Sequence, residues 1–235
     1  MIAREGPAWK IFERLKKGAM SHLHSGNGHD FEHIERMLAM RQTFWSEIIR
    51  DEPHLVSDPF LPDRLDLAIS FHDLNRSAML SGKTATADAR RADFALTLMR
   101  QYGIGDATAH HVIDTIQVSY KQDAPSETDL LRLLRDFDKA DMGAVGIYRM
   151  AAVADSRNYG VFARTSDFDP HASAIEGDEN LDSFCADIKY CLEWWTNPKF
   201  IIRTRAIRNR VKRRFDYMVI FLERIRSEYQ EIGLI

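Results

Sequence analysis

The chain has 235 residues, with 32 lysines and arginines against 35 aspartates and glutamates, a net charge of −3, and 45% hydrophobic residues. This balance excludes a disordered chain and a protein whose overall basic charge would coat nucleic acid. The 2 cysteines are too few for a disulfide framework, and no stretch approaches the roughly 18 to 20 apolar residues of a membrane-spanning helix. Segment 1–20 is too charged for a secretion signal, so we expect a soluble cytoplasmic protein.

The first half of the chain has helical periodicity, and alternating strand patterns are hard to find. The pattern predicts a helix that begins near Pro7 and ends before Gly26, a helix over 30–50, and a short apolar helix over 65–71. Prolines mark a loop over 51–63. Because the apolar helix should cross the interior, the residues that follow it, His72 and Asp73, are expected to be central.

The second half continues the helical pattern, and the predicted fold class is all-α. Helices are expected over 86–102 with Gly103 as the cap, from Asp106 to a turn over 122–126, and over 127–154, 181–195 and 200–229. Gly143 and Gly146 indicate close backbone packing or a break. Segment 158–180 is rich in Asp, Ser and Gly and is predicted to be a long surface loop.

Residue types that bind metals gather at four places: 29–33, His72-Asp73, His110-His111 and 136–141. His29 and His33 share a helix face, which fits either a ligand pair or a solvated face. The His72-Asp73 doublet is either a buried metal site or a polar helix end near solvent, because a buried carboxylate must be paired or metal-bound. Asp138 and Asp141 can both face inward, whereas we expect Asp136 to form a surface ion pair.

The order of a histidine, a His-Asp doublet and a later aspartate in a helical chain resembles the HD superfamily of metal-dependent phosphohydrolases. The chain is most similar to a bacterial branch that includes nucleotide pyrophosphohydrolases. The matching motifs are His29-Asp30-x-x-His33-x-x-Arg36, Val118-Ser119-Tyr120-Lys121, Asp136-Phe137-Asp138-Lys139 and the run 143–149 that ends at Arg149. The match covers about residues 28–149. The resemblance implies one HD-type helical bundle over 1–235, with a motif-bearing core over about 22–155 and a C-terminal helical extension over about 178–235.

The resemblance also implies roles for individual residues. The metal ligands would be His33, His72, Asp73 and Asp138. His29 remains an alternative to His33. Asp141 remains an alternative to Asp138, because the segment between Asp138 and Gly143 is one residue shorter than in the branch. The chain lacks the acidic residue that many relatives carry after the doublet, so the acid or base would come from Asp30 or Asp141, beside Asp73. The substrate contacts would be His29, Arg36, Lys121, Lys139 and Arg149.

Two imidazoles and two carboxylates suit one divalent ion, Mn, Fe, Co, Ni or Zn, that activates a water molecule and polarises a phosphoryl oxygen. The expected activity is hydrolysis of a nucleoside triphosphate to a monophosphate and pyrophosphate. The alternatives are a phosphomonoesterase, a phosphodiesterase, or a non-catalytic module that binds nucleic acid through the basic run 199–214.

Three further expectations concern partners and the other histidines. We expect the basic run to be a solvated face rather than a nucleic-acid surface, no membrane partner, and a small phosphorylated substrate; a homodimer is left open. His110 and His111 are expected to be histidines of a helix start rather than ligands of a second metal.

Overall fold

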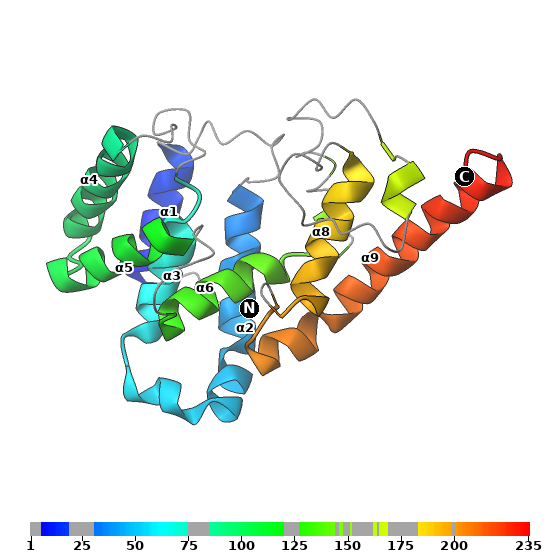
Figure 1. Cartoon of the computed structure of the whole chain (residues 1–235). Helices are drawn as coiled ribbons and strands as arrows, with labels where there is room; N and C mark the ends of the chain where they lie inside the picture. The colour runs from blue at the N-terminus through cyan, green and yellow to red at the C-terminus, as the bar shows by residue number, and fades with distance from the viewer. Residues whose placement is uncertain are drawn as a thin grey trace. The chain divides into compact units, whose positions relative to one another are not determined.

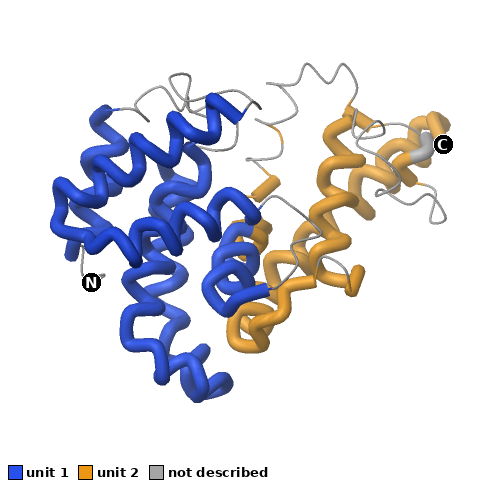
Figure 2. Tube along the Cα trace, turned by 60° about the vertical axis from the view of Figure 1, so that its left-hand side comes forward, with its two compact units in different colours: residues 1–25, 29–138 blue, residues 26–28, 139–235 orange. Residues whose placement is uncertain are grey.

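The computed structural model describes residues 6–18, 31–74, 85–119, 127–143, 146–147, 151, 162–163, 165–168, 183–198 and 201–235. Its regular elements there are helices, which confirms the all-α prediction (Figure 1). None of the described helices combines the length and the apolar character needed to cross a membrane. The chain forms two compact units, residues 1–25 with 29–138 and residues 26–28 with 139–235 (Figure 2). The predicted organisation as one HD-type domain stays a prediction.

The first unit is built around the apolar helix α3. Its helices are α1 (Pro7–Lys17), α2 (Phe31–Asp51), η1 (Pro53–Ser57), α3 (Leu61–Phe71), α4 (Ala85–Gln101), α5 (Asp106–Ser119) and α6 (Asp129–Ala140) up to Asp138. Helix α3 packs against α1, α2 and α5, and every residue from 65 to 71 is buried. The helix therefore crosses the interior of the unit, as its sequence predicts, and it delivers His72 and Asp73 to a buried position.

Helix α3 begins earlier than predicted. The loop expected over 51–63 contains η1, and α3 starts at Leu61. Pro62 lies in the first turn of this helix. A first-turn residue needs no hydrogen-bonded N–H, so the proline that was interpreted as part of a loop is compatible with the helix start.

The long helix predicted over 127–154 is interrupted. Helix α6 ends at Ala140, and Gly143 adopts φ +105°, a conformation that favours glycine. A Cβ added to Gly143 would lie 2.8 Å from the Cβ of Arg214. The Arg214 side chain donates a hydrogen bond of 2.8 Å to the carbonyl oxygen of Ala140. Gly143 is thus both a break and a site of close packing.

The second unit contains η3 (Thr165–Phe168), α8 (Phe184–Thr196) and α9 (Arg205–Glu231). Helix α8 begins after Ser183, whose hydroxyl accepts a hydrogen bond of 3.0 Å from the amide of Ala186. Helices α8 and α9 pack together, and Trp195 stacks on Phe215 with ring centroids 5.1 Å apart. Both cysteines lie buried in α8 as free thiols, and burial raises the pKa of Cys185 to about 12.

Several cations of the basic run are occupied inside the second unit. The guanidinium of Arg208 lies 4.5 Å from the ring centroid of Trp195, Lys212 pairs with Asp216, and Arg214 binds Ala140. These contacts fit a solvated helix face better than a surface reserved for polynucleotide. The absence of a nucleic-acid partner stays a prediction.

Replacement of Gly143 by alanine should destabilise the protein more than the same change at Gly6. Both glycines have similar φ angles, +105° and +102°, but nothing lies within 4 Å of a Cβ at Gly6. We expect Gly6→Ala to cost about 1 kcal/mol from the backbone conformation, and Gly143→Ala about 2–4 kcal/mol because the Arg214 contact adds to it. Urea unfolding of both variants measures the difference. Equal losses would mean that the close contact has no energetic weight.

Candidate metal centre

Helices α2 and α3 pack antiparallel and bring His33 to the His72-Asp73 doublet. Near the start of α2, His33 meets His72; eight residues later, Arg41 forms an ion pair with Asp66 in α3. Both partners of that pair are largely buried, and the contact is bidentate. The Arg41–Asp66 pair therefore fixes the register of the two helices about two turns away from the histidines.

Three side chains approach one atom, the Nε2 of His33. Its distances are 3.1 Å to the Oδ1 of Asp138, 3.3 Å to the Nε2 of His72 and 3.9 Å to the Oδ2 of Asp73. The Nε2 of His72 lies 3.3 Å from that same Asp73 oxygen. One donor atom from each of His33, His72 and Asp73 lies within 4.8 Å of the other two. All four residues belong to the first unit.

Three residues of the cluster are buried and the fourth, Asp138, is partly exposed. The side chains of His33 and Asp73 are 0% and 2% exposed, and His72 is also buried, whereas that of Asp138 is 39% exposed. Asp138 is therefore the most exposed of the four residues. The buried donors have exchanged water for one another, which is costly for a carboxylate without a cation or hydrogen-bond donors.

The tautomer of His72 follows from its surroundings. Its Nδ1 lies 2.7 Å from the carbonyl oxygen of Ile69, which can only accept a hydrogen bond. The proton of neutral His72 is therefore on Nδ1, and the lone pair of Nε2 points into the cluster. A hydrogen bond from the ring nitrogen that does not bind the metal commonly orients a metal-binding histidine.

The donor set fits one metal ion. Two imidazole nitrogens, each about 2.1 Å from a shared ion at a tetrahedral or octahedral angle, are roughly 3.0–3.4 Å apart. The Nε2 atoms of His33 and His72 are 3.3 Å apart. Two imidazoles and two carboxylates also supply the ligand types that divalent transition metals prefer. The cluster can hold a divalent ion without rearrangement of its two histidines.

Contacts between α6 and α2 place Asp138. The guanidinium of Arg132, in the first turn of α6, donates to Glu52 at 2.6 Å and to Asp129 at 2.8 Å. Next to Asp138 in the sequence, Phe137 stacks on Phe44 of α2 with ring centroids 6.4 Å apart. Arg135 donates to the carbonyl oxygens of residues 118 and 119 at the end of α5. Helix α6 is thus held against α2 by Phe137 and against the end of α5 by Arg135.

A second group of possible ligands, Glu52, His54 and Asp129, is a weaker candidate. His54 is exposed, and Arg132 already donates hydrogen bonds to both carboxylates of the group. A metal ion there would have to displace a guanidinium, whereas the cluster around His33 includes two carboxylates beside two histidines.

The remaining site predictions have varied outcomes. Arg36 lies in α2, half-buried, with its guanidinium 3.8 Å from Glu32. Lys139 and the buried Asp141 belong to the second unit, whereas Asp138 is the aspartate next to His33. The predicted residues outside the described part of the chain are His29, Asp30, Lys121 and Arg149. Their roles stay predictions.

The prediction for Asp136 was wrong. Asp136 is 2% exposed, so it is not a surface ion pair. It lies between Leu133 and Ala140 on the inward side of α6, which the spacing of three and then four residues explains.

His110 and His111 lie in the first turns of α5, as expected of helix-start histidines. His110 is exposed and its Nδ1 is 2.7 Å from the carbonyl oxygen of Asp106, while His111 contacts Arg64 at 3.3 Å. Neither belongs to the cluster around His33.

The Arg41–Asp66 pair was missed at the level of the sequence. Its signal is an aspartate inside the mainly apolar stretch 65–71, together with an arginine on the preceding helix.

Comparison with known proteins identifies the fold. The chain matches no protein-family profile and no curated protein sequence. Among solved structures it is similar to YpgQ of Bacillus subtilis in complex with ADP, with a TM-score of 0.58 and 20% identity over 96% of this chain and 98% of that one. It is also similar to a protein of Lactobacillus plantarum, with a TM-score of 0.57 and 15% identity over 94% of this chain and 98% of that one. The chain has an all-α fold of the HD type.

Removal of a buried donor should weaken metal binding strongly. We expect purified protein reconstituted with Mn²⁺ to retain one ion per chain, and His72→Ala and Asp73→Ala to weaken Mn²⁺ binding at least about 100-fold, because each removes a direct ligand. Titration calorimetry and elemental analysis measure this. His54→Ala is the matched control and should bind Mn²⁺ like the parent protein. The reverse pattern would move the metal to the group around Glu52.

The stability of the protein should respond to the proton on Asp66. Burial raises the pKa of Asp66 from 3.8 to about 6, although the hydrogen bond and charge of Arg41 oppose the rise. Between about pH 4 and pH 6 the unfolded chain has lost this proton while the folded protein keeps it, so the free energy of unfolding falls as pH rises. The fall from this residue is up to about 3 kcal/mol.

Asp66→Asn isolates this contribution because asparagine does not titrate. Urea unfolding at pH 4 and pH 6.5 should show that the parent protein loses more stability with rising pH than Asp66→Asn does. Identical pH profiles would show that Asp66 is already ionised in the folded protein at pH 4.

Proposed function

We propose that the protein is a metal-dependent phosphohydrolase whose substrate is a nucleotide, and that it cleaves a nucleoside triphosphate to a monophosphate and pyrophosphate. The observation that carries the proposal is the cluster of two imidazoles and two carboxylates around the Nε2 of His33, in an HD-type fold. Support for a nucleotide comes from the similar structure of B. subtilis YpgQ, which was solved in complex with ADP.

The four side chains of the cluster would serve as ligands of the metal ion. His33, His72 and Asp73 are buried and would hold the ion, with Asp138 as the fourth ligand at the exposed edge. When bound, a divalent ion such as Mn, Fe, Co, Ni or Zn lowers the pKa of water and polarises a phosphoryl oxygen. His72 keeps its orientation through the Ile69 carbonyl, so the site needs little reorganisation during the reaction.

The reaction forms one bond and breaks another at the α-phosphorus. Water attacks phosphorus, the bond to pyrophosphate breaks, and the proton of water passes to a carboxylate. Asp30 and Asp141 are our candidates for that base, because the carboxylates at the cluster would be engaged with the ion. Arg36, Lys121, Lys139 and Arg149 are the candidates that would offset the phosphate charge.

Hydrolysis should depend on Asp73 and His72 and should not depend on His110. With Mn²⁺ and a mixed nucleotide panel, we expect the parent protein to release monophosphate and pyrophosphate, and Asp73→Ala and His72→Ala to lose at least about 1,000-fold in kcat/KM. His110→Ala is the control, because it removes a histidine on the exposed side of α5. Chromatographic product analysis measures all four proteins.

The products distinguish the proposed pyrophosphohydrolase from a phosphomonoesterase and a phosphodiesterase. Release of nucleoside and phosphate, or opening of a cyclic nucleotide, would keep the metal site and replace the substrate class. No turnover by a Mn²⁺-loaded parent protein would refute nucleotide hydrolysis.

A further inference from the structure

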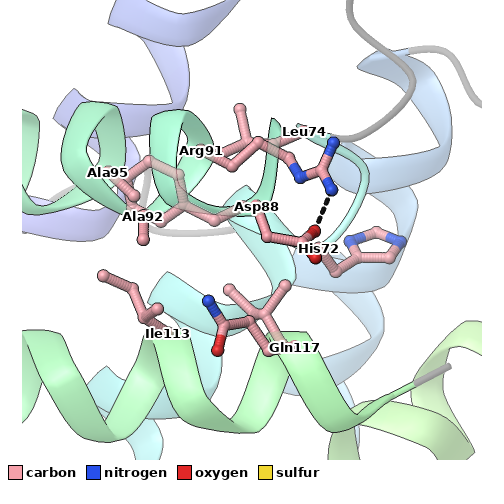
Figure 3. Close-up of a pocket in the computed structure, with 10 residues that line it drawn as sticks. His72, Leu74, Asp88, Arg91, Ala92, Ala95, Ile113 and Gln117 are labelled. Carbon is pink, nitrogen blue, oxygen red and sulfur yellow. Dashed lines mark hydrogen bonds and ion pairs between the residues drawn. The ribbon is translucent and has the colours of Figure 1, made fainter. Parts of the chain in front are cut away.

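A cavity of about 90 Å³ adjoins the metal centre within the first unit. It lies where the end of α3 meets α4 and α5, and it shares a wall with the centre because His72 lines it. Figure 3 shows Ala92 and Ala95 of α4 on one side of the cavity and Ile113 and Gln117 of α5 on the other. A molecule held at the metal centre would therefore have an adjacent cavity that its phosphates do not occupy.

The interior of the cavity is apolar. Its apolar lining residues in the described part of the chain are Phe71, Leu74, Ala92, Ala95, Ile113 and Ile116. The two alanines leave space on the α4 side that a longer side chain would fill. Apolar walls of this kind suit the faces of a flat ring, whose transfer from water is favourable.

The rim of the cavity is polar. Asp88 and Arg91 form an ion pair one turn apart on α4, and Gln117 is an exposed residue of α5 that offers both an amide donor and an amide acceptor. Apolar walls with a few polar groups at the edge are the usual composition of a site for a small organic ring. A heteroaromatic ring has the matching character, apolar faces and a hydrogen-bonding edge.

We infer that this cavity receives the base of the nucleotide, through a six-membered heteroaromatic ring, while the phosphates lie at the metal centre. The inference rests on the proposed function and deepens it. The volume is below the roughly 150 Å³ of an apolar cavity that encloses benzene, so a ring seated here would not be fully enclosed and its edge would stay at the open rim. A pyrimidine, or the six-membered ring of a purine, meets this requirement.

Filling the cavity should weaken binding of nucleotides and leave the metal centre unaffected. Ala95 is buried on the cavity wall, so Ala95→Leu would occupy the space of the ring. We expect Ala95→Leu to raise KM for nucleoside triphosphates at least tenfold. Inorganic tripolyphosphate, which has no ring, should inhibit the variant and the parent protein with the same inhibition constant, and the affinity for Mn²⁺ should not change. Ala89→Leu, an exposed substitution on the same helix, is the matched control.

Gln117→Ala tests the rim independently of any repacking. The residue is exposed, so the variant should fold normally, and loss of one hydrogen bond to the base should raise KM about 3-fold to 10-fold for the preferred nucleotide. Running uridine, cytidine, adenosine and guanosine triphosphates separates the two ring sources. An Ala95→Leu effect confined to pyrimidines indicates a single-ring site, and an equal effect on all four indicates the six-membered edge shared by both classes.

The inference and the proposed function fail in different ways. If the parent protein hydrolyses nucleotides but both variants keep the parental KM for every base, the cavity does not hold the base. If the parent protein hydrolyses none, calorimetric binding of nucleotides still decides, because weaker binding to Ala95→Leu would support the cavity while the hydrolase proposal fails.

Discussion

The antiparallel contact between α2 and α3 is the constraint on which the rest of the first unit depends. It is fixed at one end by His33 against His72 and at the other by Arg41 against Asp66. Breaking a buried ion pair typically costs about 3–5 kcal/mol, because the remaining charge has no partner. The pair therefore makes a sliding motion of α2 along α3 expensive. A slip of one residue would turn His33 by about 100° and separate the donors of the cluster.

The same arrangement brings two carboxylates close to one histidine nitrogen, one of them buried and the other partly exposed. Asp73 is almost fully buried and Asp138 approaches the same histidine nitrogen from α6. Two neighbouring carboxylates repel each other, and a cation placed between them relieves this repulsion. In the first turn of α6, by contrast, a positive side chain lies beside the acidic ones, because Arg132 binds Glu52 and Asp129. The carboxylates of that second acidic group therefore form ion pairs that stabilise the fold.

The sequence predicts much of this arrangement, and its failures have physical causes. The His72-Asp73 doublet after an apolar helix was enough to expect a central position, since that helix can only be buried. The start of α3 was misplaced because Pro62 is equally typical of a loop and of a first helical turn. Asp136 was misplaced because an acidic side chain is normally exposed, and its burial depends on tertiary contacts that one helix does not encode. The partnership of Arg41 with Asp66 depends on the register of two helices, which no local pattern contains.

The two alanines of α4 give the molecule a way to diversify. Ala92 and Ala95 line a space beside His72 and carry none of the cluster's donor atoms. A mutation there alters the volume and shape of the space while the imidazoles and carboxylates keep their positions. A mutation of His33 or Asp73 has no such latitude, because every donor in the cluster faces another. Over evolutionary time, descendants of this scaffold can therefore acquire new ligand preferences by changes of a few methylene groups on one helix, with the inorganic half of the site inherited intact.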